Sequence, residues 1–219
     1  MSKINFNWRI RIFFVCYIAI LIFFVKAPFG FLALNTFLGY IPIELSFQLH
    51  RIQKVHSLLF VILLLVWLLF YPNAPYVLTD LFHLSLLHPH NLITGLLKSD
   101  PKIWLNFAFL VISALSCALL GTLQLYKLCH LLATKMTPHL HGASLLYPLI
   151  FTFLSSVGIY IGRFLRIHSL YILLTPTWFI KQISSMWSTN MWLFTLILTV
   201  VQLILYWLIV EIHRTDLSD

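Results

Sequence analysis

Two short segments place ionisable side chains next to strongly apolar sequence, where a charge is expensive. In residues 70–84, FYPNAPYVLTDLFHL, the side chains that could do chemistry are Asn73, Tyr76, Thr79, Asp80 and His83. In residues 155–169, SSVGIYIGRFLRIHS, Arg163 and Arg166 lie three positions apart and so point the same way from a helix. Because a guanidinium matches a carboxylate or a phosphate, we predict that Asp80 pairs with one of these arginines and that the two segments together line a ligand-binding pocket.

Such a pocket fits three functions. The first is binding or transport of an anionic or lipid-like ligand, with the arginines on its phosphate or carboxylate and Glu44 completing the pocket. The second is an intramembrane enzyme acting on a lipid or lipid-linked substrate, with Asp80 or His83 as general base and the arginines as electrostatic stabilisers. The third is an accessory membrane subunit, in which the ion pair only fixes the fold. The sequence assigns no catalytic residue among these alternatives.

The histidines near Asp80 do not predict a metal site. Asp80, His83, His88 and His90 have the spacing D-x2-H-x4-H-x-H, which matches no established zinc motif. Pro89 favours an extended loop, in which imidazoles at alternate positions point in opposite directions. We therefore expect neither a metal nor a cofactor.

The composition places the chain in a membrane. Hydrophobic residues make up 61% of the 219 residues and charged residues 9%, whereas soluble domains carry about 25% charged residues. The net charge of +8 is scattered over many loops, which argues against a nucleic-acid partner. The lipid bilayer is the expected partner, with a lipid or small anion as ligand, and no motif specifies a protein partner.

Apolar stretches near the ~20 residues that cross a bilayer recur along the whole sequence. We predict an all-α, polytopic membrane helix bundle that forms a single domain over residues 1–219, with a broken or re-entrant segment near residues 72–84. Six membrane spans are expected, at about residues 10–25, 29–49, 57–71, 102–126, 143–162 and 191–210. The mixed segment between the last two spans carries aromatic and basic residues that suit a membrane surface.

An even number of spans places both ends of the chain on one side of the membrane. With the N-terminus inside, eight Lys and Arg residues fall in inner segments and six in outer segments. Lys3, Arg9 and Arg11 precede the first span, and basic residues in that position usually stay in the cytoplasm. We therefore expect a multi-pass protein of the cell membrane with both termini cytoplasmic.

Two prolines predict how Asp80 approaches the arginines. Pro72 and Pro75 lack N–H groups and restrict the residues before them, so residues 72–75 should be non-helical. Asn73 could cap a short helix over about residues 75–84, which would gather the polar side chains of this segment on one face. The other segment contains a GxxxG pattern, Gly158 and Gly162, which is typical of close helix contacts in membranes.

Three segments resemble the signature segments of a bacterial membrane family, domain of unknown function 1361. They are NTFLGYIP at residues 35–42, YPNAPYVLTDLFHL at 71–84 and SSVGIYIGRFLRIHS at 155–169. The resemblance implies a multi-helix protein of a bacterial inner membrane, and it implies no activity. It places the motif positions at Asn73, Pro75, Tyr76, Thr79, Asp80, His83, Gly158, Gly162, Arg163 and Arg166.

Two sites depart from the pattern of that family. Asn106 stands where the family tends to have an aspartate, and His168-Ser169-Leu170-Tyr171 stands where it tends to read asparagine, serine, tryptophan, aspartate. Two carboxylates are therefore missing from this chain. If relatives use them in a hydrolytic or metal-dependent reaction, this chain would be altered or inactive, which weakens the enzyme alternative.

Overall fold

The computed structural model describes residues 5–52, 55, 57–91, 93–140, 142–165 and 176–215. These residues contain helices and no strand, which confirms the predicted all-α bundle. The α-helices are α1 (Phe6–Phe24), α2 (Phe31–Ile52), α3 (Leu58–Phe70), α4 (Asn73–Thr79), α5 (Pro101–Lys135), α6 (Ala143–Tyr160), α8 (Pro176–Ser185) and α9 (Thr189–Thr215). Two short helices of other types complete the set: the 3-10 helix η1 (Asp80–Leu87) and the π-helix η2 (Ile161–Leu165).

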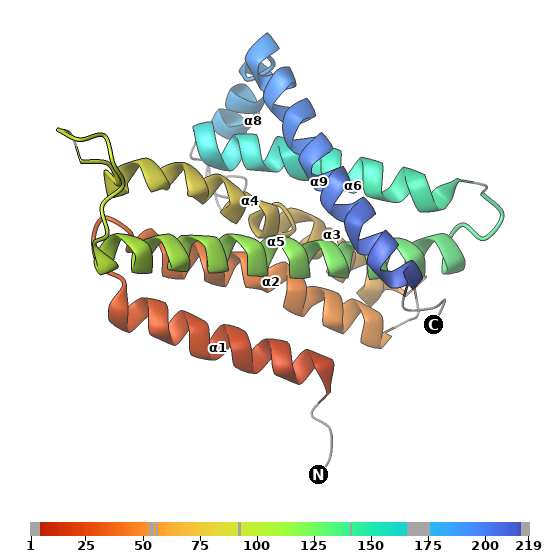
Figure 1. Cartoon of the computed structure of the whole chain (residues 1–219). Helices are drawn as coiled ribbons and strands as arrows, with labels where there is room; N and C mark the ends of the chain where they lie inside the picture. The colour runs from red at the N-terminus through yellow and green to blue at the C-terminus, as the bar shows by residue number, and fades with distance from the viewer. Residues whose placement is uncertain are drawn as a thin grey trace.

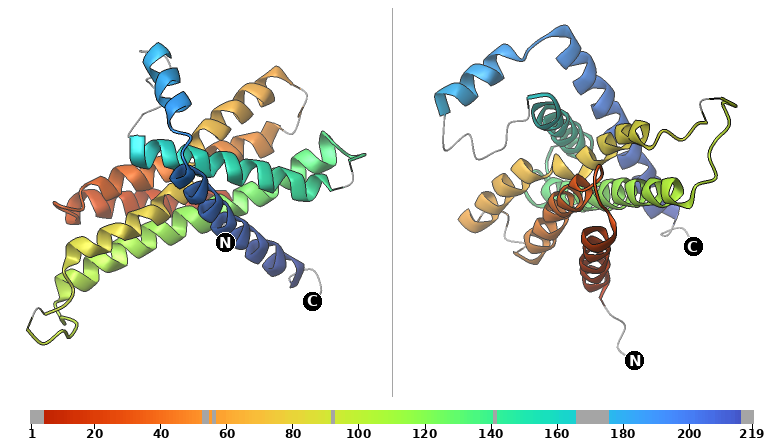
Figure 2. Two further views of the ribbon diagram at one scale, coloured as in Figure 1. Left: turned by 90° about the horizontal axis from the view of Figure 1, so that it is seen from above. Right: turned by 90° about the vertical axis from the view of Figure 1, so that its left-hand side faces the viewer.

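Successive long helices run back and forth along one common direction (Figure 1). α2 returns antiparallel to α1, α5 and α6 form another antiparallel pair, and α9 crosses the bundle obliquely (Figures 1 and 2). α2 contacts α1, α3, α4 and α5, and α5 contacts α2, α4, α6, α9 and η1. α1 begins and α9 ends towards the same end of the bundle.

The bundle exposes apolar side chains and buries polar ones. Large apolar side chains point outward along the helices, for example Phe23 on α1, Leu58 on α3 and Leu196 on α9. Buried between helices are hydroxyl and amide side chains: Thr36, Ser46, Ser113, Thr122, Gln124, Thr152, Ser155, Ser156, Thr195, Thr199 and Gln202. Some of them bond across helices, as Gln202 Nε2 does to Ser156 Oγ at 2.8 Å. An apolar outside with a polar, hydrogen-bonded inside suits lipid surroundings.

Five helical stretches are long and apolar enough to cross a membrane: Phe6–Phe24, Leu58–Leu87, Pro101–Lys135, Ala143–Leu165 and Thr189–Thr215. The chain is therefore a multi-pass membrane protein. α2 overlaps the second predicted span but is not among the five, because Asn35, Glu44 and Gln48 lower its hydropathy. Its 22 residues are long enough to cross, at about 1.5 Å per residue. A sixth crossing by α2 and a single domain over residues 1–219 stay predictions.

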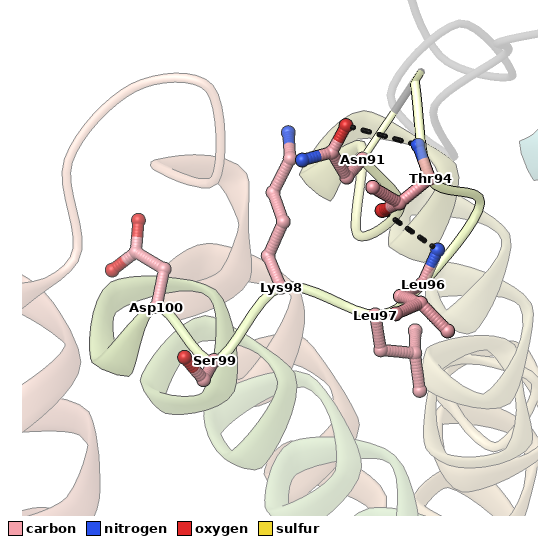
Figure 3. A pocket seen from close by; sticks show the side chains of 7 residues that line it. All are labelled: Asn91, Thr94, Leu96, Leu97, Lys98, Ser99 and Asp100. Carbon is pink, nitrogen blue, oxygen red and sulfur yellow. Dashed lines mark hydrogen bonds between the residues drawn. The ribbon is translucent and has the colours of Figure 1, made fainter.

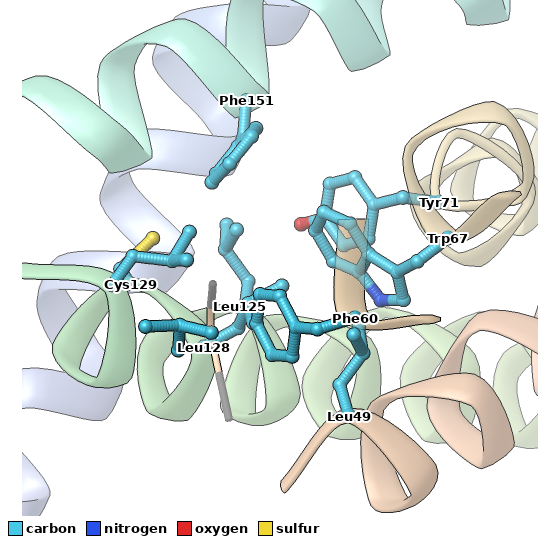
Figure 4. Close-up of a cluster of buried hydrophobic side chains, with 10 residues drawn as sticks. Leu49, Phe60, Trp67, Tyr71, Leu125, Leu128, Cys129 and Phe151 are labelled. Carbon is cyan, nitrogen blue, oxygen red and sulfur yellow. The ribbon is translucent and has the colours of Figure 1, made fainter. Parts of the chain in front are cut away.

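One buried cluster fixes the end of α3 (Figure 4). Trp67 and Tyr71 stack with ring centroids 4.7 Å apart, and Phe151 of α6 meets Trp67 edge-on at 5.5 Å. Leu125 and Leu128 of α5 are fully buried in the same cluster. Because three helices converge here in close packing, the point at which α3 ends is fixed relative to α5 and α6.

The break after α3 is shorter than predicted. α3 ends at Phe70, Tyr71 and Pro72 lie between the helices, and α4 begins at Asn73. The prediction that all of residues 72–75 would be non-helical is wrong, because Pro75 is the third residue of α4, where a helix leaves the backbone N–H unbonded in any case. The two connecting residues keep helical backbone angles, so the chain bends and does not unfold.

Asn73 does not cap α4 as predicted. Its amide Nδ2 donates to Phe70 O at 2.9 Å, and α4 has no side-chain cap bond. Ala74 N donates to Tyr71 O at 3.0 Å, so it does not serve the Phe70 carbonyl. The side chain of Asn73 thus replaces a backbone donor at the end of α3, which offsets the cost of a freed carbonyl in a membrane.

The predicted helix over residues 75–84 also divides into two. α4 ends at Thr79, and the tighter helix η1 follows directly. His83 Nδ1 lies 3.0 Å from Asp80 O, three residues back, a spacing that suits a 3-10 turn. Asp80 is therefore the first residue of η1, at the junction between two kinds of helix.

Candidate ligand-binding site at Asp80 and Arg163

Asp80 lies where three segments of the bundle meet. Its side chain is 1% exposed, and Arg163 Nη1 of η2 donates to Asp80 Oδ1 at 3.2 Å. Asn35 Nδ2 of α2 donates to Asp80 Oδ2 at 2.7 Å. The predicted ion pair is therefore present, and a neutral amide completes it. A buried carboxylate needs such partners, because an isolated charge in an apolar interior is costly.

Arg163 is held on one side only. Nη1 also approaches the Tyr76 hydroxyl at 3.4 Å, and Nη2 donates to Thr79 O at 3.2 Å. A guanidinium has five N–H groups. Nε–H and one N–H of Nη2 have no hydrogen-bond partner among the residues that the structure describes. The Arg163 side chain is 22% exposed, so it retains an accessible side that Asp80 lacks.

The backbone around Arg163 is an unusual helix type. α6 passes into the π-helix η2, whose middle residue is Arg163. π-helical turns are rare and occur often at functional sites. No residue pattern predicts this turn, because the change from α-helical to π-helical hydrogen bonds depends on the segments against which the helix packs.

Gly158 lets α6 lie close to the bend between α3 and α4. A Cβ at Gly158 would sit 2.6 Å from Pro72 Cγ, well inside contact distance. At Gly162 it would sit 3.7 Å from the Tyr76 ring, an ordinary contact. The predicted close helix contact is thus made at Gly158, and it brings η2 alongside α4 and η1.

His83 borders the ion pair without bonding to the carboxylate. Its Nδ1 is 3.8 Å from Asp80 Oδ1 but forms its hydrogen bond with the Asp80 backbone carbonyl. The ring lies against Phe31 of α2, with centroids 4.4 Å apart. Thr79 bonds locally too, since its hydroxyl donates to Tyr76 O at 2.7 Å. Both residues shape the surroundings of the pair.

One of the predicted site residues, Asn73, is not joined to the pair. Asn73 bonds to Phe70 O, and it lies at the opposite end of α4 from Asp80. Arg166 lies outside the described residues. The structure therefore brings together Asp80, Arg163, Tyr76, Thr79 and His83, and their role in ligand binding stays a prediction.

Sequence reasoning did not include Asn35 in the site. An amide in the apolar run before Pro42 was the available signal, since a polar side chain in a span usually has a partner within the protein. Asn35 also opens the first of the three family-like motifs. The structure shows its partner to be Asp80, the acid of the second motif.

Glu44 belongs to a different ion pair, which corrects the prediction that it completes the Asp80 pocket. Arg11 Nη2 donates to Glu44 Oε1 at 2.7 Å, and Arg11 Nε donates to Glu44 Oε2 at 2.9 Å. Tyr40 and Gln48 each add a bond of 2.8 Å to the same carboxylate. Arg11, counted above as a basic residue ahead of the first span, lies inside α1 and joins it to α2.

His88 and His90, which follow His83, have different structural positions. His88 ends η1 with a left-handed φ of 44°, and His90 forms a β-bridge with Leu97. Within the described residues, no group of three or more His, Cys, Asp or Glu side chains is arranged to hold a metal ion.

A shallow hollow of about 560 Å³ lies on the loop that follows η1 (Figure 3). Residues between Asn91 and Asp100 line it, and it is wide open to the outside. Neither Asp80 nor Arg163 lines this hollow, so it is separate from the ion pair. All of its lining residues come from one loop, so the hollow results from the conformation of that loop.

The fold and the buried ion pair define a multi-pass helical membrane protein with a charged site inside its bundle. The family model described as "Protein of unknown function (DUF1361)" matches residues 34–205. The chain belongs to this family, as its three motifs indicated. The matched range includes Asn35, Asp80 and Arg163. Neither the curated proteins nor the solved structures contain a match to the chain.

Proposed function

We propose that this protein binds the anionic headgroup of a lipid or lipid-linked molecule at the accessible side of Arg163, and that it presents or transports that molecule. One observation carries this function. Asp80, Tyr76 and Thr79 hold one side of the guanidinium, while two N–H groups lack partners among the described residues. A guanidinium already held in place loses little side-chain entropy when it binds a phosphate or carboxylate.

Apolar side chains near the pair suit a lipid tail. Phe164, next to Arg163, and Phe82, on η1, are both more than half exposed. An amphiphile whose head meets Arg163 would place its chain along this apolar surface, where burial of methylene groups contributes about 0.8 kcal/mol each. A lipid-like ligand therefore fits better than a small free anion.

The enzyme alternative has weaker support. Both oxygens of Asp80 already accept bonds, from Arg163 and from Asn35, so the carboxylate is poorly placed to take a proton from a substrate. His83 uses Nδ1 on a backbone carbonyl, which leaves its Nε2 as the candidate base. The Asp80–Arg163 pair is therefore better suited to positioning the guanidinium charge than to general acid–base catalysis.

We also propose that the protein resides in a bacterial cell membrane with both termini cytoplasmic. The family-like motifs support the location, and Lys3 and Arg9 ahead of the hydrophobic part of α1 support the orientation. This requires α2 to cross as well. A phosphatase fused to the C-terminus should be inactive in cells, whereas a fluorescent reporter should be bright. An active phosphatase would contradict six crossings with this orientation.

Native mass spectrometry with defined lipids tests the proposed binding. Phosphatidylglycerol and a fatty acid, which offer a phosphate and a carboxylate, should stay bound to more of the protein than diacylglycerol, which offers neither. Arg163→Gln should remove this preference. Arg214→Gln is a matched control, because Arg214 is an exposed arginine that pairs with Glu211 on α9. Equal retention of all three lipids by the native chain would contradict an anion-binding site.

A further inference from the structure

The loop between η1 and α5 carries an exposed apolar tip. Ile93 is 94% exposed, Leu96 70% and Leu97 59%. Burial of each such side chain away from water would contribute about 1.5–3 kcal/mol of free energy, and exposure to water loses this contribution. These side chains lie beyond the helices and outside the predicted spans, so the crossing helices do not explain them. Exposed apolar groups gathered at a loop tip mark a contact surface.

The backbone of this tip is satisfied by the loop itself. Ile93 N and Thr94 N donate to Asn91 Oδ1 at 2.9 and 3.4 Å, and Gly95 N donates to Asn91 O at 2.8 Å. Leu96 N donates to Thr94 Oγ1 at 3.4 Å. Four consecutive N–H groups therefore need no water. A loop that is to leave water must satisfy its backbone in this way, because lipid provides no hydrogen-bond partners.

The base of the loop is tied down and basic. Lys98 N donates to Pro89 O at 2.8 Å, and Lys98 Nζ reaches His88 O at 3.1 Å. Trp104 Nε1, in the first turn of α5, donates to Lys98 O at 3.2 Å. Lys98 and Lys102 lie on either side of the α5 N-terminus. Tryptophan and lysine in such a position are typical of the membrane–water interface.

The loop reaches sideways from the bundle, past the ends of η1 and α5 (Figure 2, right). In that view α1 and α6 are seen nearly end-on and α5 and α9 obliquely, so the loop reaches across the direction of α1 and α6. The neighbouring helices also expose apolar side chains, Phe82 and Leu86 of η1 and Leu105 of α5. The tip therefore adds to the apolar side chains that these helices expose.

We propose that Ile93, Leu96 and Leu97 form the apolar tip of an interfacial anchor, which inserts into the headgroup–acyl boundary of the leaflet next to η1. The occupant of this surface is the lipid bilayer. The lysines at the base of the loop contact lipid phosphates, and the aliphatic tip lies just below them. Because η1 begins at Asp80 and ends where the loop begins, the anchor also fixes the end of η1 against the membrane surface.

Spin labelling in liposomes tests this anchor. Ile93→Cys and Ser99→Cys are made in a Cys16→Ser background, since Cys16 is the exposed cysteine and Cys117 and Cys129 are buried. The label at position 93 should collide several-fold less with a water-soluble nickel chelate than the label at 99, and more with oxygen. The background variant without an added cysteine should not label.

Two results would overturn the anchor. Nickel accessibility at position 93 equal to that at 99 would place the tip in water. Strong spin–spin broadening at position 93 that disappears on dilution with unlabelled protein would show that a second copy of the chain covers the tip. Neither result bears on binding at Arg163, because both labels lie on the loop and leave the ion pair unchanged.

Discussion

Two arginine–carboxylate pairs join helices of the bundle, and they differ in geometry. Arg11 and Glu44 form a two-pronged pair between regular helices, with side chains 27% and 30% exposed. Arg163 and Asp80 share a single contact of 3.2 Å, between a π-helix and a 3-10 helix. In the second pair the acid is sealed from solvent and the arginine is not.

The difference indicates a different role for each pair. Glu44 accepts four hydrogen bonds, two of them from Nε and Nη2 of Arg11, which suits this pair to joining α1 to α2. Arg11 also stacks over Trp8 at 4.9 Å from the ring centroid. Arg163 and Arg11 both retain N–H groups without a hydrogen-bond partner among the described residues. The two pairs therefore differ in the burial of the acid and in the helix types that they join: Arg163 lies beside a carboxylate that is sealed from solvent.

Removing the acid of the buried pair should have the largest effect on stability. Asp80→Ala leaves Arg163 and Asn35 without their acceptor, and we expect a loss on the order of 3–5 kcal/mol in the free energy of unfolding. Unfolding in mixed detergent micelles, followed by tryptophan fluorescence, measures this. Asp80→Asn, which keeps the shape, should lose less. A loss for Asp80→Ala no greater than for Glu44→Ala would show that the two pairs are equivalent.

The close contact at Gly158 should come next in size. Gly158→Ala places a methyl group 2.6 Å from Pro72 Cγ and should cost about 1–3 kcal/mol, because α6 must move away from the bend. Gly162→Ala is the matched control: its methyl group would meet the Tyr76 ring at 3.7 Å, so it should be near neutral. The same unfolding assay compares them. Equal losses at both glycines would mean that the approach of α6 does not depend on Gly158.

The smallest effect is expected at the partly exposed pair. Glu44→Gln keeps the shape but removes the charge and replaces one accepting oxygen by an NH2 group. A partly exposed pair of this kind contributes about 0–1 kcal/mol. A double-mutant cycle with Arg11→Gln isolates the coupling between the two side chains. The corresponding cycle with Asp80→Asn and Arg163→Gln should give the larger coupling. The reverse order would contradict the assignment of the buried pair as the stronger one.

The ion pair could be predicted from sequence because burial of charge is so costly. Asp80 and Arg163 both lie in apolar runs, and each needs a partner of opposite charge, which left few choices. Asn35 is harder to assign from sequence, because a neutral amide costs less to bury and points less clearly to one partner. Arg11 was assigned to the region ahead of the first span, because an arginine near the start of a hydrophobic run is ordinarily an orientation signal.

The backbone at the site could be predicted only in outline. Pro72 and Pro75 indicated a break, but a proline in the first turn of a helix is tolerated, so the new helix begins earlier than expected. The switch to a 3-10 helix at Asp80 and to a π-helix at Ile161 depends on contacts between segments far apart in sequence. Local propensity carries no information about such contacts.

A lipid-binding titration of two arginine variants tests the central claim most directly. The native chain, Arg163→Gln and Arg11→Gln are titrated with phosphatidylglycerol and with a fatty acid in the same neutral detergent, after each variant is shown to be folded. The contrast between the two pairs predicts that Arg163→Gln weakens binding of the anionic amphiphiles at least tenfold, equal to about 1.4 kcal/mol. Arg11→Gln should bind like the native chain. Equal binding by all three proteins, or equal loss in both variants, would contradict a ligand site at Arg163.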